Sequence, residues 1–266
     1  MQLPVTPHLR DRLATADRPL AGMWVCSGSP LVAEICAGSG LDWLLVDMEH
    51  APNGLASVLA QLQAVAAYPV TPVVRVPSAD AVVIKQVLDL GATTLLVPMV
   101  SSAAEAEAVV AAAHYPPRGR RGVGSALARS ARWNRIDGYL TDAAAHVSVF
   151  VQVESAEAVA AAADIAGVEG IDGVFVGPSD LAASMGLLGQ QSHPEVTAAV
   201  RQAFAAVTAA GKPVGVNAFD PAVADAYLAA GASFVLVGAD VSVLARSSES
   251  LAARFTGAGP TARAGY

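Results

Sequence analysis

Two stretches decide the fold class: Val149-Phe-Val-Gln-Val-Glu154 and Val174-Phe-Val-Gly-Pro-Ser-Asp180. Each begins as a β-branched and aromatic run without alternating polar residues, which is typical of a strand buried on both faces. Each run ends in an acid that has no basic neighbour in the sequence. A carboxylate is tolerated there only where the buried strand opens into a loop. The two stretches therefore predict parallel strands of an α/β sheet, each with a carboxylate at its end.

Similar apolar runs recur along the chain and alternate with Ala-rich segments, which predicts strands alternating with helices. Such alternation predicts a (β/α)8 barrel, since continuously apolar strands must be covered on both faces. An open doubly wound sheet is the alternative, but no Gly-rich phosphate-binding turn follows the first strand. The predicted strands span 22–26, 42–47, 72–76, 94–98, 148–154, 172–177, 213–217 and 234–238. The predicted helices span 30–38, 54–67, 79–90, 102–113, 155–166, 194–210, 220–230 and 240–255.

The length and composition fit one large domain. The 266 residues are 54% hydrophobic and 15% charged, so the chain can bury a large core. We expect a single barrel domain over 1–255 and a disordered tail over 256–266. The segment 114–146 is long for a connection in a compact domain, and such segments are usually functional.

The charge pattern and the cysteines limit the class of protein. The net charge is −7 and the main basic cluster is Arg118-Gly-Arg120-Arg121, which argues against a nucleic-acid partner. No apolar stretch is long enough to cross a bilayer, and the charged segment after Thr6 lacks the apolar core of a secretion signal. The two cysteines, Cys26 and Cys36, form no CxxC pair. We therefore expect a cytoplasmic protein.

Polar residues gather at the predicted carboxyl ends of the strands. Barrel enzymes build their active sites at this rim, so these residues predict a single site. The residues at these strand ends are Trp24, Asp47-Met-Glu-His50, Arg75, Pro98, Gln152, Glu154, Gly177, Pro178, Ser179, Asp180, Asn217 and Gly238.

Glu154 and Asp180 are the candidate metal ligands. Gln152 lies two residues before Glu154 on a strand, so both side chains point to the same face. Two carboxylates and an amide, with open positions for water and substrate, are typical of an octahedral Mg²⁺ or Mn²⁺ site. The sequence offers no His/Cys cluster for a closed zinc site. The alternative interpretation is that the two acids only cap the helical turns that follow them.

His50 and Arg75 are the candidate catalytic residues. His50 follows Asp47 at a strand end, and an imidazole held by a carboxylate is a common general base, although a lone loop histidine is otherwise structural or solvated. Arg75 ends an apolar strand, where a guanidinium needs an anionic partner. That partner is Asp47 or Glu49, or else a carboxylate or enolate oxygen of a ligand.

Other reactive groups are less well placed. Lys85 and Lys212 are the only lysines; one falls in a helix and the other before the seventh strand, so Schiff-base chemistry is poorly supported. Cys26 has no base beside it and is expected to be a small core residue. The stretch Arg120–Ser125 is a weak signal for anion binding by backbone amides, and Trp133 is expected in packing or an interface.

Ordered motifs between residues 20 and 255 resemble the HpcH/HpaI aldolase family. The matching motifs are Gly22-Met-Trp, Ala33-Glu34, Asp42-Trp-Leu-Leu-Val-Asp47-Met-Glu-His50-Ala-Pro-Asn53, Val97-Pro-Met-Val100, Tyr115-Pro-Pro-Arg-Gly, Arg121-Gly-Val-Gly-Ser-Ala-Leu-Ala-Arg, Val151-Gln-Val-Glu154 and Val176-Gly-Pro-Ser-Asp-Leu181. The resemblance implies a metal-dependent (class II) pyruvate aldolase on a pyruvate-binding (β/α)8 barrel. Such an enzyme reversibly cleaves a 4-hydroxy-2-oxo acid into pyruvate, or a related 2-oxo acid, and an aldehyde.

The resemblance also implies roles for individual residues. Glu154 and Asp180 match the residues that hold a divalent ion (Mg²⁺, Mn²⁺ or Co²⁺), with no organic cofactor. Arg75 matches the residue that stabilises the pyruvate enolate. His50 matches the residue that moves protons, here with acidic support from Asp47 and Asp89.

Substrate contacts and assembly follow from the same resemblance. Trp24, Gln152 and the amides of 177–179 match positions near the substrate. The family is typically a homohexamer, a trimer of dimers, in which the last helix is exchanged onto a neighbouring barrel. This chain departs from the family's heptanedioate enzymes at Asn217 and Phe219, where a more aliphatic segment is expected, so the aldehyde is left open.

Two other functions compete with this one. A citramalyl- or malyl-CoA-type lyase on a related barrel would need basic residues for the nucleotide phosphates, and only Arg118–Arg121 could serve. A barrel retained as a binding or scaffold protein would be favoured by loss of any of Glu154, Asp180, Arg75 or His50, and all four are present.

Overall fold

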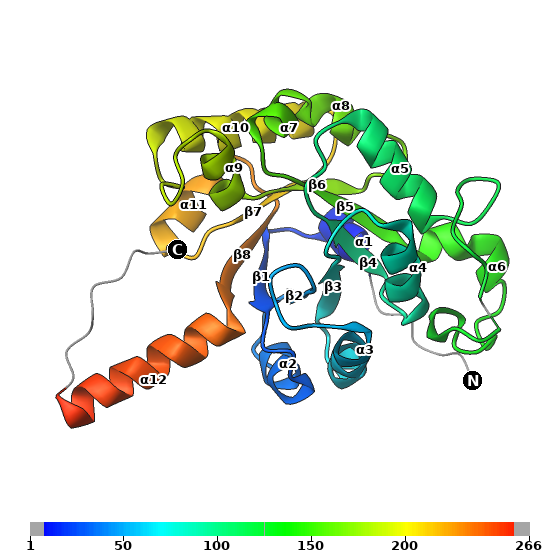
Figure 1. The fold of residues 1–266 in the computed structure, drawn as a ribbon, viewed down its shortest axis with the longest axis horizontal. Coiled ribbons are helices and arrows are strands. Elements are labelled where there is room, and N and C mark those ends of the chain that lie inside the picture. Colours follow the sequence, from blue (N-terminus) through cyan, green and yellow to red (C-terminus); the bar gives the residue numbers. More distant parts are fainter. Residues whose placement is uncertain (1–7, 125, 258–266) are drawn as a thin grey trace.

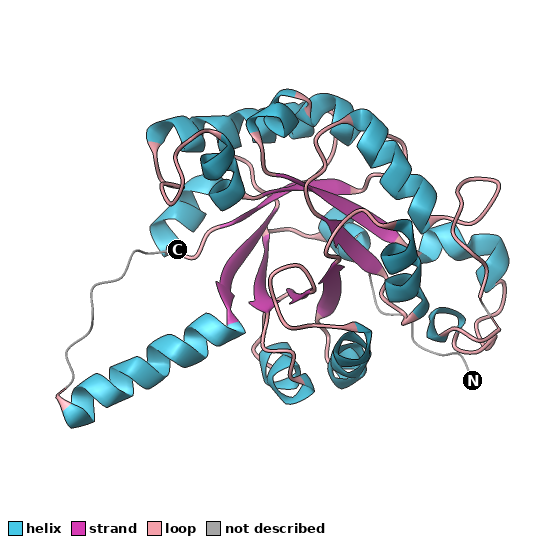
Figure 2. Ribbon diagram, viewed as in Figure 1, coloured by secondary structure: helices cyan, strands magenta, loops and turns pink. Residues whose placement is uncertain are grey.

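The computed structural model describes residues 8–124 and 126–257. Within them eight parallel strands form a closed barrel in the order β1 to β8, surrounded by helices (Figure 2). Each strand lies within two residues of its predicted span, so the predicted (β/α)8 barrel is confirmed. The strands are β1 (Leu20–Val25), β2 (Trp43–Asp47), β3 (Thr71–Arg75), β4 (Thr94–Val97), β5 (Ser148–Val153), β6 (Gly173–Val176), β7 (Val214–Asn217) and β8 (Phe234–Ala239).

The helices follow the strands in turn (Figure 1). All eight predicted helices are present, although 155–166 is divided into α7 and α8 and the end of 54–67 is a 3₁₀ turn. The helices are α1 (Leu9–Thr15), α2 (Pro30–Ala37), α3 (Leu55–Ala64), α4 (Ala81–Asp89), α5 (Ala103–Ala113), α6 (Tyr139–Asp142), α7 (Ala156–Ala160), α8 (Ala162–Gly167), α9 (Pro178–Ser184), α10 (Pro194–Ala209), α11 (Pro221–Ala229) and α12 (Asp240–Thr256). The 3₁₀ turns are η1 (Val65–Ala67), η2 (Arg129–Ala131) and η3 (Ala143–His146).

Aromatic rings fill the inside of the barrel. Trp43 and Phe150 both meet Phe234 edge-on, with ring centroids 5.7 and 5.4 Å apart. Gly215 faces the Phe234 ring so closely that a Cβ there would overlap it. Small residues opposite large ones let the interior close without a void, as in barrels whose cores are packed solid.

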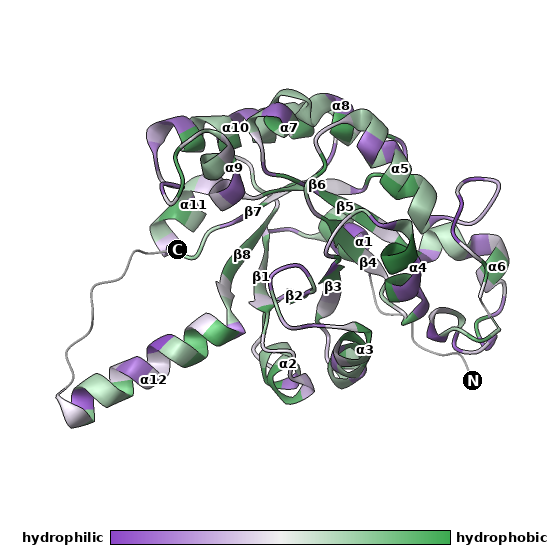
Figure 3. Cartoon of the chain, in the orientation of Figure 1, coloured by the Kyte–Doolittle hydropathy of each residue, from purple (hydrophilic) through white to green (hydrophobic). Residues whose placement is uncertain are grey.

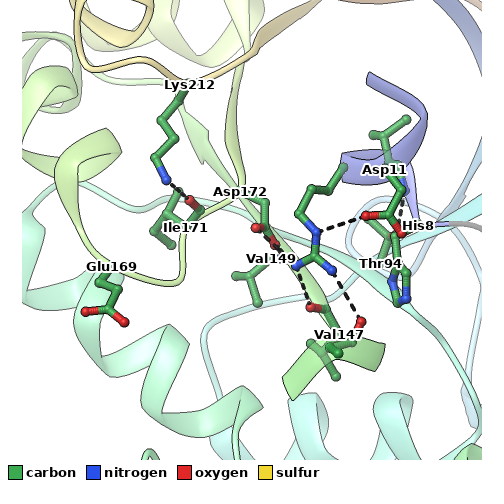
Figure 4. A network of polar contacts seen from close by, with 12 residues as sticks. His8, Asp11, Thr94, Val147, Val149, Glu169, Ile171, Asp172 and Lys212 are labelled. Carbon is green, nitrogen blue, oxygen red and sulfur yellow. Dashed lines mark hydrogen bonds and ion pairs between the residues drawn. The ribbon is translucent and has the colours of Figure 1, made fainter. Parts of the chain in front are cut away.

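The amino-terminal end of the barrel is closed by α1, which the sequence analysis did not predict. The backbone amide of Leu9 donates to the Thr94 hydroxyl (3.2 Å), and Arg10 donates to the Asp172 carboxylate (3.3 Å). On the same side, Lys212 Nζ donates to the Ile171 carbonyl (2.7 Å; Figure 4). The carboxyl-terminal rim is therefore the end that is left for a site.

The carboxyl-terminal helix α12 projects away from the barrel (Figure 1). Asp240 is its only buried residue among 240–256, and Leu244, Leu251 and Phe255 are exposed. Apolar and polar residues share its length (Figure 3). The helix α12 continues to Thr256, one residue into the predicted tail, and the positions 258–266 lie outside the described residues. Among the described residues, no helix combines the length and apolarity needed to cross a membrane.

Candidate active site

The predicted residues meet at the carboxyl-terminal rim. Asp47 ends β2 and Arg75 ends β3, and the two are register partners in the barrel. Glu154 follows β5, Asp180 lies in the first turn of α9 and Asn217 ends β7. The parallel arrangement brings these strand ends to one face, as the sequence analysis predicted.

Arg75 is held by two acids. Its Nε and one Nη donate to the two Asp47 carboxylate oxygens, both at 2.8 Å, and its other Nη lies 2.8 Å from a Glu49 oxygen. Of the possible partners of Arg75, which were Asp47, Glu49 and a ligand oxygen, both acids are in place. Each terminal nitrogen still carries a second N–H, so Arg75 can also bind an anionic oxygen.

Trp24 links Arg75 to the opposite side of the barrel. The Arg75 guanidinium carbon lies 4.2 Å from the centroid of the Trp24 ring, a cation–π distance. The indole Nε1 donates to the side-chain oxygen of Asn217 (2.8 Å). A polar network therefore runs from β2 and β3 across β1 to β7.

Glu154 is a buried carboxylate with too little positive charge near it. Burial raises its pKa to about 7, and the negative charges of Asp180 and Glu49 act in the same direction. Hydrogen bonds from the Gln152 side chain and from the Met99 backbone amide (2.8 Å) oppose this rise only in part. A divalent cation would remove that cost.

Neither acid acts as the simple helix cap considered in the sequence analysis. The hydroxyl of Ser155 caps α7, while the Glu154 carboxylate points to Gln152 and Met99. Asp180 lies in the first turn of α9, but no side-chain cap bond is formed at the start of that helix.

The residues fit a hard divalent ion. Glu154 and Asp180 supply carboxylate oxygens, and the Gln152 amide oxygen is buried without a hydrogen-bond partner among the described residues. A Cβ at Gly177 would stand 2.8 Å from a Glu154 oxygen, so glycine keeps the space beside the carboxylate open. No group of three or more His, Cys, Asp or Glu in the described part of the chain is arranged to hold a metal. Two carboxylates with open positions suit Mg²⁺, which usually keeps several waters.

His50 lies at the edge of this group with its side chain 66% exposed. Its ring Nε2 is 3.8 Å from a Glu49 oxygen, while its backbone amide donates to Asp47 (3.3 Å). The acid beside the imidazole is therefore Glu49 and not Asp47, the acid predicted from the sequence. Asp47 instead orients the loop after β2, since its carboxylate also accepts a hydrogen bond from the Glu49 backbone amide (3.0 Å).

Asp89, which the resemblance offered as a second support for His50, has a different partner. It ends α4 and accepts a 2.7 Å bond from Arg121, which is buried and stacks on Tyr115 at 4.7 Å. Within the described residues no hydrogen bond or ion pair joins Asp89 to His50. This ion pair ties the segment 114–146 to α4, whereas Ser125 of the suggested anion-binding stretch lies outside the described residues.

The remaining reactive groups are where the sequence placed them. Lys85 is on α4, and Lys212 precedes β7 at the closed end of the barrel. Burial raises the pKa of the Cys26 thiol to about 12, which makes it a poor nucleophile. Trp133 is half-exposed, with Arg135 5.6 Å from its ring centroid.

Two site residues were missed by the sequence analysis. Glu49 is predicted at the rim and as a possible partner of Arg75 but not as the acid beside His50, although its place between Asp47 and His50 is a usable signal. Burial raises the pKa of Glu49 despite the opposing charge of Arg75. Met99 contributes a backbone amide from a left-handed conformation (φ 57°), and a backbone donor leaves no sequence signal.

A cavity of about 300 Å³ lies between the start of α9 and the end of β7, and Arg75, Glu154 and Asp180 are not among the residues that line it. Pro178 and Ser179 line it next to Asp180, and Asn217, Phe219 and Asp220 line it from the end of β7. Such a volume is at the small end of ligand pockets. The predicted substrate-binding positions on both loops therefore face one hollow.

Comparison with known proteins gives a consistent picture. Residues 20–247 match the HpcH/HpaI aldolase/citrate lyase family. A 4-hydroxy-2-oxo-heptane-1,7-dioate aldolase of Salmonella dublin is 54% identical over 240 residues, which are 90% of this chain and 91% of that protein. The crystal structure of an HpcH/HpaI aldolase/citrate lyase family protein from Burkholderia cenocepacia J2315 is 42% identical, with a TM-score of 0.89 over 93% of this chain and 98% of the other.

A more distant barrel shares the fold alone. It is the citrate lyase beta subunit from M. tuberculosis, complexed with oxaloacetate and magnesium. That protein is 19% identical, with a TM-score of 0.57 over 85% of this chain and 92% of the other.

Proposed function

Since this chain belongs to the HpcH/HpaI aldolase/citrate lyase family and is a carbon–carbon lyase, we propose that it reversibly cleaves 4-hydroxy-2-oxo acids to pyruvate, or a related 2-oxo acid, and an aldehyde. The observation that carries the proposal is the burial of Glu154 beside Asp180, on the same rim as Arg75. A buried acid that lacks a positive partner, with a second and exposed acid near it, suits a 2-oxo acid bound through a divalent ion.

We propose that Glu154 and Asp180 hold the ion and that Gln152 positions Glu154 through its hydrogen bond. A bound Mg²⁺, Mn²⁺ or Co²⁺ would supply positive charge beside the 2-oxo acid. The Ser179 backbone amide, in the first turn of α9, is suited to the substrate carboxylate, because helix amino termini favour anions. Pro178 has no N–H, and the Gly177 amide donates to the Val153 carbonyl (3.1 Å).

Side chains of this protein can stabilise the developing negative charge and transfer the proton. In cleavage the C3–C4 bond breaks, its electron pair moves toward the 2-oxo group, and C3 is then protonated to give pyruvate. Arg75, fixed by Asp47, would stabilise the developing oxyanion; removing one such donor typically costs about 10²–10³-fold in rate. His50, with Glu49 beside it, would take the proton from the 4-hydroxyl group as that group becomes the aldehyde.

A Schiff-base aldolase is the mechanistic alternative, and it is less well supported. Such an enzyme needs a desolvated lysine among the reacting groups. Lys212 instead donates to the Ile171 carbonyl at the closed end, and Lys85 is on an outer helix. A CoA-thioester lyase is also less well supported, because two of the three clustered arginines, Arg118 and Arg121, already form ion pairs.

Exchange of the pyruvate methyl protons with D₂O, followed by NMR, tests the proposal without any aldehyde. Wild type with Mg²⁺ should exchange them, and EDTA or Glu154→Gln should suppress the exchange. Exchange that survives EDTA, together with trapping of pyruvate on the protein by borohydride, would establish the lysine mechanism instead. His50→Ala should lose retro-aldol activity on a 4-hydroxy-2-oxo acid, and undiminished activity would remove His50 from the mechanism.

We also propose that the protein is a homohexamer in which α12 packs on a neighbouring barrel. The support is the 17-residue helix with a single buried residue and several exposed apolar side chains. An amphipathic helix of this length normally buries its apolar side.

A further inference from the structure

One polar side chain is fully buried on helix α3, among apolar residues that pack on the barrel. Gln61 is 0% exposed, and the other buried residues of this helix are Val58 and Leu62. The Gln61 Nε2 donates to the side-chain oxygen of Asn53 (2.7 Å) and to the Ser57 carbonyl (3.1 Å). Its Oε1 has no hydrogen-bond partner among the described residues. Burying an amide with one end unpaired is unfavourable, so packing alone does not explain a glutamine at this position.

Backbone carbonyls fix how the side-chain amides of Gln61 and Asn53 are turned. A carbonyl oxygen can only accept, so the Gln61 atom that meets the Ser57 carbonyl is the nitrogen. The Asn53 atom that meets this same nitrogen is therefore the oxygen. The Asn53 nitrogen is then free to donate to the Asp47 carbonyl, which it meets at 2.7 Å. A chain of hydrogen bonds thus runs from the buried side of α3 to the end of β2.

These hydrogen bonds close the loop 48–53, which carries Glu49 and His50. The backbone amides of Glu49 and His50 donate to the Asp47 carboxylate (3.0 and 3.3 Å). Asn53 returns to the carbonyl of the same aspartate, so the loop is attached to Asp47 near both of its ends. The imidazole of His50 is 66% exposed and lies 3.8 Å from Glu49. The backbone of the loop therefore decides where the imidazole stands.

We propose that Gln61 and Asn53 are positioning residues for the proton transfer by His50. This inference rests on the proposed aldolase function and assigns two further residues to it. Asn53, Ser57 and Gln61 are spaced by four residues, which places them in line along α3. The Ser57 hydroxyl also donates to the Asn53 oxygen (2.9 Å). Loss of Gln61 therefore loosens Asn53 without releasing it.

Gln61→Leu tests the assignment, with Gln63→Leu as the matched control. Both variants lose a glutamine amide on α3, but Gln63 is exposed. Gln61→Leu should lower kcat for cleavage of 4-hydroxy-2-oxopentanoate about tenfold, because a displaced imidazole transfers the proton poorly. Its affinity for Mn²⁺ should stay at the wild-type value, since Glu154 and Asp180 are not in the loop. Its free energy of unfolding in urea should not fall, because leucine has no unpaired oxygen to bury.

Gln63→Leu should change none of these three quantities. A wild-type kcat in Gln61→Leu would overturn the assignment. So would a loss of kcat that comes with an equal loss of Mn²⁺ affinity or with a loss of stability, because Gln61 would then support the fold in general.

Asn53→Ala is the second variant. It should lower kcat at least as much as Gln61→Leu does, since it removes the bond to the Asp47 carbonyl itself. Adding Gln61→Leu to Asn53→Ala should have no further effect on kcat, because Gln61 acts only through Asn53. A further loss in the double variant would show that Gln61 acts by another route and would overturn the assignment.

Backbone hydrogen exchange separates this inference from the proposed function, because it needs no substrate. In Gln61→Leu the amides of 48–53 should exchange about tenfold faster than in wild type, while those of β2 keep their protection. Exchange of the loop at the wild-type rate would overturn the positioning role even in an active enzyme. Wild type that fails to exchange the methyl protons of pyruvate would instead overturn the aldolase function on which this role rests.

Discussion

Asp47 and Arg75 face each other as register partners at the ends of β2 and β3, joined by two hydrogen bonds of 2.8 Å. Both side chains are almost fully buried. A buried ion pair contributes little net stability, but removing one partner leaves the other charge buried without compensation. The pair therefore fixes where the guanidinium points into the site.

Asp47→Ala should destabilise the protein strongly. Breaking a buried pair typically costs about 3–5 kcal/mol, and Glu49 retains part of the compensation, so we expect about 3 kcal/mol. Urea denaturation at neutral pH measures the change. Glu249→Ala, which removes the exposed Arg246 pair, is the control and should cost less than about 1 kcal/mol. Equal effects in the two variants would contradict the role given to Asp47.

Gly177→Ala should weaken metal binding without unfolding the barrel. The added methyl group would stand 2.8 Å from a Glu154 oxygen and 3.1 Å from the Gln152 nitrogen, so the carboxylate must move. Disturbing the support of a ligand typically costs about 10–100-fold in metal affinity. Titration calorimetry with Mn²⁺ measures it. Gly167→Ala is the matched control, since nothing lies within 4 Å of its Cβ and its backbone is not left-handed. Unaltered Mn²⁺ affinity in Gly177→Ala would argue against Glu154 as a ligand.

The barrel and the convergence of the site could be predicted because both depend on local pattern. Continuous valine-rich runs predicted the strands, and Glu154 and Asp180 stood out as acids after two of them. Parallel topology then requires all carboxyl ends to meet. The short helix α1 was missed because its seven residues carry three charges and bury only Leu9.

The pairings within the site could not be predicted, because they join distant residues. Trp24 and Asn217 are 193 positions apart, and nothing in either segment indicates the bond between them. The Met99 amide reaches Glu154 through a backbone conformation that the residue type does not specify. The resemblance implied that Asp89 supports His50, whereas the structure pairs Asp89 with Arg121, 32 positions further along the chain.

Acidification should destabilise the fold through buried neutral histidines. Burial lowers the pKa of His114 and of His8, and the Thr93 carbonyl 3.0 Å from the His8 ring offsets this only in part. Histidine side chains in the unfolded chain have a pKa near 6.5. Below that pH they bind protons that His8 and His114 do not bind in the folded protein. The contribution of these two histidines to the free energy of unfolding is therefore intact above pH 6.5 and falls as the pH drops below that value.

The measurement compares the free energy of unfolding of wild type and His114→Gln at pH 7.5 and 5.5. The raised pKa of Glu154 acts with the opposite sign between its unfolded value and about 7, but it is common to both proteins and cancels in the difference. His114→Gln should lose less stability than wild type on acidification. The charged groups acting on His114 are Arg118, Arg121, Arg10 and Asp172, and none of them is altered. Parallel pH curves for the two proteins would refute the prediction.

Leu251→Glu should reduce the size of the assembly. Leu251 is 59% exposed on α12. The only buried residue of that helix is Asp240 at its start. Its carboxylate accepts hydrogen bonds from the backbone amides of Cys26 (2.8 Å) and Ser27 (3.0 Å). Among the described residues, the large apolar side chains Leu244, Leu251 and Phe255 of α12 are left exposed, and a buried carboxylate in a subunit contact is costly. Light scattering after size exclusion should give a hexamer for wild type and a smaller species for Leu251→Glu. Ser250→Glu adds the same charge one residue away and should stay hexameric. A monomeric wild type, or a Leu251→Glu variant of wild-type mass, would show that this face of α12 is not a subunit contact.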